Sequence, residues 1–318
     1  MKRVSAVILL LLMPAIIFAS SEGTAAAVFL KVPAGARPAG MGSAFTGIGD
    51  DINSLYWNPA GITSVETIEF MGTYSQVFED VTSMYTGIIL PIGKTRIGVA
   101  VTYLSMGDIE IRDSGGNLMS DSSKIYDMAT GITYAFGNER MSLGITGKTI
   151  TSNLGNYVGT GMAFDLGVLL KFSPKLSAGF DIQNLGGKIK YDTANNDLPM
   201  TIKVGFGYRF TESILAALDI DSPKDGGMKI HTGGEVALGK SFIVRAGYDQ
   251  IDNSINFEKG VTFGFSFLPK FNSGGGDEFD MESAVSESNS PNVRIDYALT
   301  SLSAELGVTN RVSVYLKF

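Results

Sequence analysis

The sequence contains no cysteine, one histidine and one tryptophan among its 318 residues. Without cysteine, the chain has no disulfides, thiol nucleophiles or cysteine-ligated metal sites. A single histidine also excludes metal sites built from several histidines. Charged residues make up only 18% of the chain, and the formal net charge is −7. Because binding to phosphates needs a basic surface, we expect no nucleic-acid partner.

Long apolar runs are also missing after the N-terminus. Lys2 and Arg3 precede a short apolar core at 7–18, and small residues follow it. This layout predicts a cleaved secretory signal at 1–21, with cleavage after Ala27 as the alternative, because the core is too short to span a bilayer as a helix. We therefore expect an exported protein without a helical membrane anchor.

Glycine and alternating apolar residues are abundant instead. The chain has 39 glycines, 19 phenylalanines and 12 tyrosines. In the segment 261–267, valine and three phenylalanines occupy the odd positions, and threonine, glycine and serine occupy the even ones. The segment 201–210 alternates in the same way. Strict alternation over such lengths predicts strands with one apolar face and one polar or small face.

Alternation of this kind recurs along nearly the whole mature chain. The segments that show it are 66–78, 81–91, 95–107, 124–136, 139–151, 157–172, 175–184, 199–210, 213–221, 228–238, 241–250, 260–270, 292–300 and 310–318. They number fourteen, and an even number is typical of single-chain bacterial outer-membrane barrels. A closed barrel is also the only sheet that satisfies all its backbone groups within lipid.

The connections between these segments alternate in length. The tight ones are at 91–94, 137–139, 173–174, 211–212 and 239–240, and the long ones are at 108–123, 185–198 and 251–259. Tight turns at one end and long loops at the other are typical of the periplasmic and extracellular ends of a barrel. The short connection near Glu79 and Asp80 is an exception. The loops at 108–123 and 185–198 are the expected partner surface.

These patterns predict an all-β fold, a fourteen-stranded antiparallel transmembrane outer-membrane β-barrel with a small N-terminal plug. The predicted organisation is a signal peptide at 1–21, a plug segment with a short helix at 22–65, and the barrel at 66–318. Outer-membrane lipid would surround it, in a diderm bacterium. The alternative is a soluble secreted β-sandwich or propeller, but that fold does not account for the alternating loop lengths.

The last strand carries a predicted assembly signal. Val312, Val314, Leu316 and Phe318 share one face of the segment that ends the chain. A terminal aromatic that closes an alternating strand is similar to the signal read by the barrel-assembly machinery. We therefore assign this signal to Phe318, together with Tyr315.

The segment before the barrel does not alternate and is rich in glycine. Asp50 is placed to cap a short helix that runs to Trp57, and the proline at position 59 blocks its continuation. The segment has the size of an internal plug. We expect its contacts with the wall to come from the following residues: Arg37, Asp50, Asp51, Asn58 and Pro59. An exposed arm is the alternative, but it would leave several large apolar side chains in water.

The polar faces of the strands predict a charged interior. The expected lumen charges are His231, Glu235, Arg245 and Asp249. Charges of mixed sign inside a barrel pair with one another, so we expect a filled lumen rather than an open porin. The segment 234–241 matches the P-loop pattern in letters, but it lies across a strand, a turn and a second strand. We therefore expect no nucleotide, no cofactor and no metal.

Both ends of the mature chain carry family motifs. The run FLKVPAGARPAGMGSAF at 29–45, followed by an Asp pair at 50–51 and NPAG at 58–61, resembles the start of PorV/PorQ-family barrels, which belong to the wider FadL-like superfamily. The tail at 295–300 (IDYALT) and 305–313 (ELGVTNRVS) resembles the C-terminal motif of the family. The resemblance implies a fourteen-stranded outer-membrane barrel with an N-terminal plug.

The resemblance also implies a function. PorV-like proteins take part in type IX secretion and receive exported proteins, whereas FadL-like proteins transport fatty acids and other hydrophobic molecules. We therefore expect a non-enzymatic secretion accessory whose partners are exported proteins or a secretion translocon, with a FadL-like transporter as the alternative. One departure from the family is an acidic, Gly/Ser-rich insertion at 272–291. Its composition predicts a flexible loop, with a docking segment for a periplasmic partner as the alternative.

Overall fold

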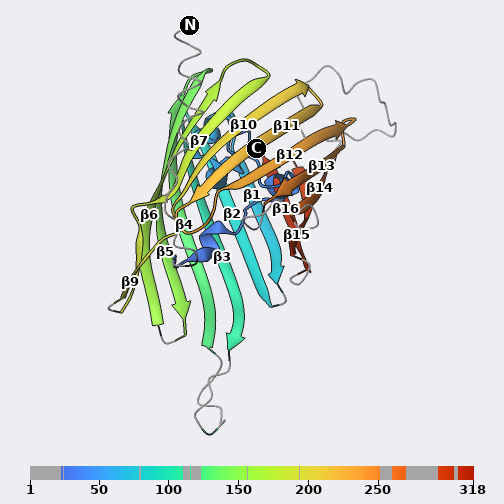
Figure 1. Cartoon of the computed structure of the whole chain (residues 1–318). Coiled ribbons are helices and arrows are strands. Elements are labelled where there is room, and N and C mark those ends of the chain that lie inside the picture. The colour runs from blue at the N-terminus through green and yellow to red at the C-terminus, as the bar shows by residue number, and fades with distance from the viewer. Residues whose placement is uncertain are drawn as a thin grey trace.

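The alternating segments form antiparallel strands that close on themselves in the computed structural model (Figure 1). The structure describes residues 25–78, 80–109, 123–155, 157–192, 194–250, 260–269, 293–303 and 307–318, with residues 23 and 115 in addition. The predicted signal peptide and the acidic insertion lie outside the described residues. The same is true of the loop at 251–259 and most of the loop at 108–123.

Sixteen strands are present in the described part of the chain. Their bounds are β1 Glu69–Phe78, β2 Val81–Ile92, β3 Thr95–Ile109, β4 Ser123–Gly137, β5 Met141–Leu154, β6 Tyr157–Lys171, β7 Leu176–Leu185, β8 Lys188–Tyr191, β9 Ala194–Asp197, β10 Thr201–Thr211, β11 Ile214–Pro223, β12 Lys229–Leu238, β13 Phe242–Asp249, β14 Val261–Phe267, β15 Val293–Ser303 and β16 Gly307–Lys317.

Fourteen of these strands form the barrel wall, namely β1–β7 and β10–β16. Each pairs with its neighbours in the antiparallel sense, β16 pairs with β1, and β7 pairs with β10. The predicted fourteen-stranded fold is therefore confirmed. The predicted strand positions hold to within a few residues, with the first strand beginning at Glu69 rather than at position 66.

The remaining two strands, β8 and β9, form a hairpin within the connection that was expected to be a plain loop. The strand β6 pairs with β7 only as far as Phe164, and its first residues pair with β8 instead, where Gly161 faces Ile189. Unpaired backbone groups are costly in a membrane wall, so a long strand beside a shorter one needs a second partner. The hairpin supplies that partner.

The two faces of the wall differ as the alternation predicts. In β14, Phe263 and Phe265 point outward and are 55% and 47% exposed, whereas Thr262 and Ser266 are fully buried. Further outward aromatic side chains lie near both ends of the strands, such as Phe136 at one end and Tyr157 at the other. An apolar outer band with aromatic girdles is the outer surface expected of a transmembrane barrel.

We name the two ends of the barrel by their connections. The tight-turn end carries the turns at 93–94, 138–140, 172–175, 212–213 and 239–241. The ends of β14 and β15 that follow each other in the chain also lie there. The long-loop end carries the connections β1–β2, β3–β4, β5–β6, β7–β10 with the hairpin of β8 and β9, β11–β12, β13–β14 and β15–β16, and it lies at the bottom of Figure 1. No helix in the described residues is long and apolar enough to span a membrane.

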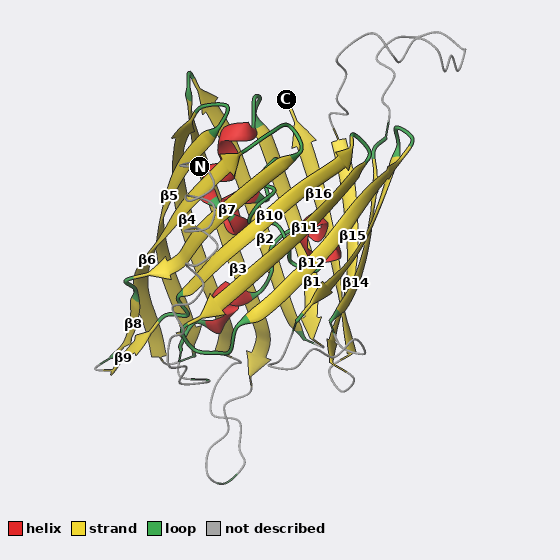
Figure 2. Cartoon of the chain, turned by 45° about the horizontal axis from the view of Figure 1, so that its top comes forward, coloured by secondary structure: helices red, strands yellow, loops and turns green. Residues whose placement is uncertain are grey.

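The N-terminal segment lies inside the barrel, where Figure 2 shows its helices within the ring of strands. Its elements are the 3-10 helix η2 Val28–Lys31, α2 Ala36–Gly40, α3 Ser54–Trp57 and the 3-10 helix η3 Pro59–Ser64. The helix α2 packs against β13–β16, and η3 packs against β3–β6 on another side of the wall. The segment therefore touches strands around much of the ring.

Close backbone approach explains part of the glycine content of the wall. Gly233 in β12 and Gly247 in β13 are direct partners across the ladder, and both point inward. A Cβ at Gly233 would lie only 2.2 Å from the carbonyl oxygen of Met41, and a Cβ at Gly247 only 2.3 Å from the backbone nitrogen of Gly42. Only glycine leaves room for the N-terminal chain at this point.

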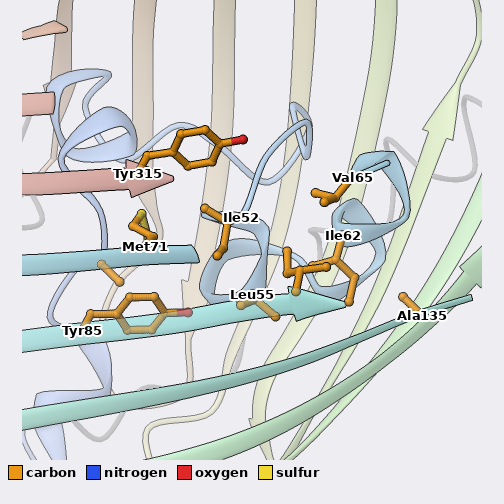
Figure 3. Packing of buried hydrophobic residues seen from close by; sticks show 10 residues of the cluster. Ile52, Leu55, Ile62, Val65, Met71, Tyr85, Ala135 and Tyr315 are labelled. Carbon is orange, nitrogen blue, oxygen red and sulfur yellow. The ribbon is translucent and has the colours of Figure 1, made fainter. Parts of the chain in front are cut away.

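An apolar cluster joins the segment to the opposite wall. Figure 3 shows the side chains of Ile52, Leu55 and Ile62 from the segment beside Met71 and Tyr85 from the strands. The three isoleucine and leucine side chains are at most 4% exposed. Burial of each such side chain stabilises the fold by roughly 1.5–3 kcal/mol. The segment is thus held by apolar packing as well as by polar contacts.

Candidate functional site in the barrel lumen

Arg37 is the centre of a buried ion-pair cluster near the tight-turn end. Its Nη1 lies 2.6 Å from Oδ1 of Asp50 and 2.8 Å from Oδ2 of Asp51, both in the same segment. Its Nε lies 2.9 Å from Oε2 of Glu235 in β12. One guanidinium therefore binds two carboxylates of the segment and one of the wall, which suits its planar array of donors.

Arginines of the wall complete this cluster from the other side. Arg245 in β13 lies 2.7 Å from Glu235, and Arg294 in β15 lies 2.9 Å from Asp51. Arg209 in β10 reaches Asp50 at 3.3 Å. We call these residues, with Arg37, the Arg37 cluster. It ties the segment to three different strands.

The charges of the segment are strongly stabilised in this setting. Burial alone would lower the pKa of Arg37, but its carboxylate partners outweigh burial and hold the pKa well above its usual value. Burial alone would raise the pKa of Asp51, but Arg37 and Arg294 hold it well below its usual range. Both groups are therefore charged at neutral pH.

Asn58 and Pro59 join the segment to the wall at a second place. The Nδ2 of Asn58 donates to the carbonyl oxygen of Val168 in β6 at 3.1 Å and to that of Thr46 at 2.9 Å. Its Oδ1 accepts a hydrogen bond from the backbone nitrogen of Ala60 and so caps η3. Pro59 packs so closely on Gly144 of β5 that a Cβ there would lie 2.3 Å from the carbonyl carbon of the proline.

The helical part of the segment differs from the sequence prediction. The helix α3 begins after Asn53, not Asp50, so the predicted cap by Asp50 is wrong. Asp50 is engaged by two arginines instead, and Oδ1 of Asp51 accepts hydrogen bonds from the backbone and side-chain nitrogens of Asn53. Ion pairing across the lumen thus outcompetes local capping here. The short helix α2 was not predicted either.

Sequence reasoning missed several wall residues that hold the segment. Oδ2 of Asp219 in β11 accepts hydrogen bonds from the backbone nitrogens of Phe45 and Thr46, at 2.8 and 2.7 Å. Oγ of Ser313 in β16 accepts one from the backbone nitrogen of Ala36 at 2.8 Å. The alternation places both side chains inward, but nothing in the sequence indicates which part of the segment they meet.

His231 and Asp249 lie farther toward the long-loop end. Nδ1 of His231 lies 3.0 Å from Oδ1 of Asp249, and its Nε2 lies 3.5 Å from Oδ2 of Asp221. Asp249 also accepts a hydrogen bond from Oγ of Ser43 at 2.7 Å. Of the four predicted lumen charges, Glu235 and Arg245 belong to the Arg37 cluster and the other two to this separate group.

A cavity of about 390 Å³ opens beside this second group, and we call it the mouth cavity. The N-terminal segment forms one wall, where Leu30, Val32 and Trp57 contribute apolar surface. Tyr56 also faces it, and its hydroxyl donates to the carbonyl oxygen of Leu30 at 2.9 Å. Burial raises the pKa of Tyr56 to about 12, so its hydroxyl stays neutral.

The lining of the mouth cavity is also rich in charge. Its lysine, arginine, histidine and aspartate residues are Lys31 of the segment and Lys203, Asp221, Asp225, Lys229, His231, Asp249 and Arg311 of the barrel. Lys203 pairs with Asp221 at 3.1 Å, and its ammonium lies 4.6 Å from the centre of the Trp57 ring. Within the described residues, no group of three or more metal-ligating side chains is arranged to hold a metal ion.

The two residues assigned to the assembly signal, Tyr315 in β16 and Phe318 just after it, point to different sides of the wall. Phe318 is 72% exposed, whereas Tyr315 is 7% exposed and points into the barrel, as Figure 3 shows. The guanidinium of Arg294 lies 4.5 Å from the centre of the Tyr315 ring. Tyr315 therefore belongs to the inner packing, and an outward aromatic signal would rest on Phe318.

Comparisons with known proteins agree on the type of barrel. The model of the family described as "Type IX secretion system protein PorV" matches residues 20–219. No curated protein matches the chain. Similar solved structures include the CymD monoaromatic hydrocarbon channel, with TM-score 0.59 and 13% identity, over 90% of this chain and 98% of that chain.

Two further solved structures are similar. One is the Pseudomonas putida toluene transporter TodX, with TM-score 0.55 and 13% identity, over 89% of this chain and 96% of that chain. The other is a Pseudomonas aeruginosa FadL homologue, with TM-score 0.53 and 10% identity, over 89% and 98%. At such low identities these likenesses show a shared FadL-like barrel fold.

Proposed function

The chain belongs to the PorV family of type IX secretion system proteins, and we propose that it is a non-enzymatic accessory of protein secretion that binds exported proteins or a larger translocon. The observation that carries this proposal is the family match over residues 20–219, which is 200 of 318 residues. The match includes the N-terminal segment and the barrel wall as far as β11.

The occupied lumen supports a binding role over general diffusion. An open porin needs a wide, water-filled channel, and lumen side chains then set its selectivity. Here the N-terminal segment fills the tight-turn half, where Arg37 is 5% exposed and Asn58 fully buried. We propose that this segment acts as a plug and that partner proteins meet the barrel on its surface.

The proposal includes an orientation in the outer membrane of a diderm bacterium. Short turns face the periplasm and longer loops face outward in barrels of this type. The tight-turn end would then face the periplasm, and the long-loop end, with the hairpin of β8 and β9, would face the exterior. On this view Phe318 lies at the periplasmic end, where the barrel-assembly machinery acts, and lipid surrounds the apolar outer band.

A FadL-like transporter of hydrophobic molecules is the second candidate, because the mouth cavity offers a lumenal space of about 390 Å³. Pockets that hold small apolar molecules are mostly lined by apolar and aromatic side chains. This cavity has eight lysine, arginine, histidine and aspartate side chains in its lining. Its charge therefore weighs against an apolar cargo and in favour of the secretion role.

An affinity pull-down of the tagged barrel from outer membranes in mild detergent tests the two candidates. Proteins and lipids that co-purify are identified by mass spectrometry. Exported proteins that share a C-terminal domain, or a giant translocon barrel, in stoichiometric amounts are the expected result. Fatty acids or other apolar compounds without protein partners would contradict the secretion role and support transport.

A matched pair of variants tests where the partners bind. Lys190 on β8 is exposed at the long-loop end, and Lys175 is exposed in a turn at the tight-turn end. We expect Lys190→Glu to reduce the recovery of protein partners and Lys175→Glu to leave it unchanged. A reversal of charge within an interface disrupts its electrostatic complementarity, whereas a reversal outside the interface does not. The opposite ranking would place the partner surface at the tight-turn end.

A further inference from the structure

Arg311 in β16 differs from the other arginines buried in the described part of the lumen. It is 2% exposed, its Nε donates to Oγ of Ser75 at 2.8 Å, and its Nη1 has no hydrogen-bond partner. Arg37, Arg245 and Arg294 each form ion pairs with at least two carboxylates, whereas Arg311 forms none with the described residues. A buried cation without a counter-charge is costly, so its retention indicates a missing anionic partner.

The location of Arg311 indicates where that partner would come from. Arg311 lines the mouth cavity, and the volume of about 390 Å³ lies within the usual range of roughly 300–1,000 Å³ for small-molecule sites. Asp249 also lines the cavity, but its carboxylate is engaged by His231 and Ser43. The space beside Arg311 is therefore bordered by a cation, and the wall carboxylate of Asp249 in the same lining already has other partners.

The charge balance of the cavity points the same way. Its lining contains four lysine and arginine side chains and three aspartates, with the histidine counted as neutral, which gives +1. The whole chain has a net charge of −7. A local excess of positive charge in an acidic protein favours an anionic ligand at this site.

The lining also restricts the body of the ligand. Lysine and aspartate side chains are spread over the wall, and they would lose hydration without compensation against a long alkyl chain. Apolar contact comes mainly from the N-terminal segment, at Val28, Leu30, Val32, Pro33 and Trp57, with Val77 and Pro223 of the wall in addition. We propose that the mouth cavity binds the carboxylate of a polar, peptide-like ligand, with Arg311 as its anchor. The guanidinium matches a carboxylate in two parallel hydrogen bonds.

A built-in probe makes this site testable. Trp57 is the only tryptophan of the chain, and it lines the mouth cavity. The purified full-length barrel in detergent is titrated with two pentapeptides of one sequence, with a free or an amidated C-terminus, while Trp57 emission is followed. We expect the free acid to bind about tenfold to a hundredfold more tightly, as for a charged hydrogen bond.

Three variants assign the effect to Arg311. Arg311→Gln should weaken binding of the free acid to the level of the amide, and Arg311→Lys should restore part of it, because a point charge remains. Arg140→Gln is the matched control, because Arg140 is exposed in a turn at the tight-turn end. Heat-dependent migration on gels confirms that each barrel is folded. If Arg311→Gln does not fold, the acid and amide pair together with Arg311→Lys still decides the question.

The remaining outcomes are also informative. Competition by free alanine would identify an amino acid as the ligand, and competition by peptides alone would identify a chain end; both support the site. Equal binding of acid and amide, an unchanged affinity in folded Arg311→Gln, or saturation by oleate but not by the peptides would overturn it. These measurements use the isolated barrel, so they can succeed or fail independently of the pull-down for secretion partners.

Discussion

The two halves of the lumen solve the problem of buried charge in different ways. In the tight-turn half, Arg37 lies between Asp51 and Glu235, and wall arginines complete the network. In the long-loop half, Arg311 has no carboxylate partner within the described residues and borders a cavity. Fully paired charges hold a structure in one arrangement, whereas an unpaired charge beside open space favours ligand binding. The contrast teaches that one barrel interior can be closed at one end and receptive at the other.

The largest effect is expected from Arg37→Ala. Loss of this guanidinium leaves buried carboxylates of the segment and the wall without their shared partner, which costs about 3–5 kcal/mol. We expect frequent opening of the lumen, measured as increased ion conductance in planar bilayers. Arg311→Gln is the matched control from the other half and should leave conductance near that of the wild type. Equal conductance in Arg37→Ala and the wild type would show that the Arg37 cluster does not hold the segment.

A smaller effect is expected from a methyl group added at Gly233, where the N-terminal segment touches the backbone of β12. Gly233→Ala would place a Cβ against the backbone of Met41, and such overpacking costs roughly 1–3 kcal/mol. Gly234→Ala is the neighbouring control, because the nearest atom to its Cβ lies 3.6 Å away. Urea unfolding in detergent should rank Gly233→Ala as the less stable variant. Equal midpoints would mean that the segment does not press on this part of the wall.

Acid should loosen the tight-turn half. The folded-state pKa of Asp51 lies below its usual value, so its contribution to stability is complete above the unfolded pKa of about 3.9 and is lost as the pH falls further. Conductance should stay low from pH 7 to about 5 and rise below about 4. In Asp51→Asn this acid-dependent rise should be weaker, with a higher starting value at pH 7. A rise already complete at pH 6 would contradict the assignment to Asp51.

The smallest effect is expected at the rim of the mouth cavity. Lys31 and Asp225 form an ion pair at 2.6 Å, but the lysine side chain is 37% exposed. Such pairs contribute about 0–1 kcal/mol, so Lys31→Gln should change the unfolding midpoint little. A loss as large as that of Gly233→Ala would show that the long-loop half is held as tightly as the other half.

Much of the wall could be predicted from the sequence. A strand between lipid and lumen must alternate with period two, so parity alone assigns Phe263 and Thr262 to opposite faces. Arg37 and Asp51 could be recognised because the N-terminal segment contains few charged residues. These assignments depend only on composition and on the local spacing of residues, and both can be read directly from the sequence.

The remaining features depend on register and on distance in space. Asp219 and Arg294 meet the segment only because the ring brings them to its path, and no local pattern indicates that. The predicted assembly signal includes Tyr315 with Phe318, although the parity of Tyr315 places it inward. Asp50 was assigned to a helix cap that Asn53 occupies, since two arginines compete for its carboxylate. The lack of a partner for Arg311 is likewise a property of the whole fold.

The most direct test of the contrast between the two halves uses the absence of native cysteine. Ser301 lines the mouth cavity, and Ser313 is fully buried, with its Oγ bonded to the backbone of Ala36. Ser301→Cys and Ser313→Cys are each treated in intact cells with a polar, membrane-impermeant maleimide. We predict labelling at position 301 and none at 313. Equal labelling of both positions, or labelling of 313 alone, would contradict a lumen that is closed in one half and open in the other.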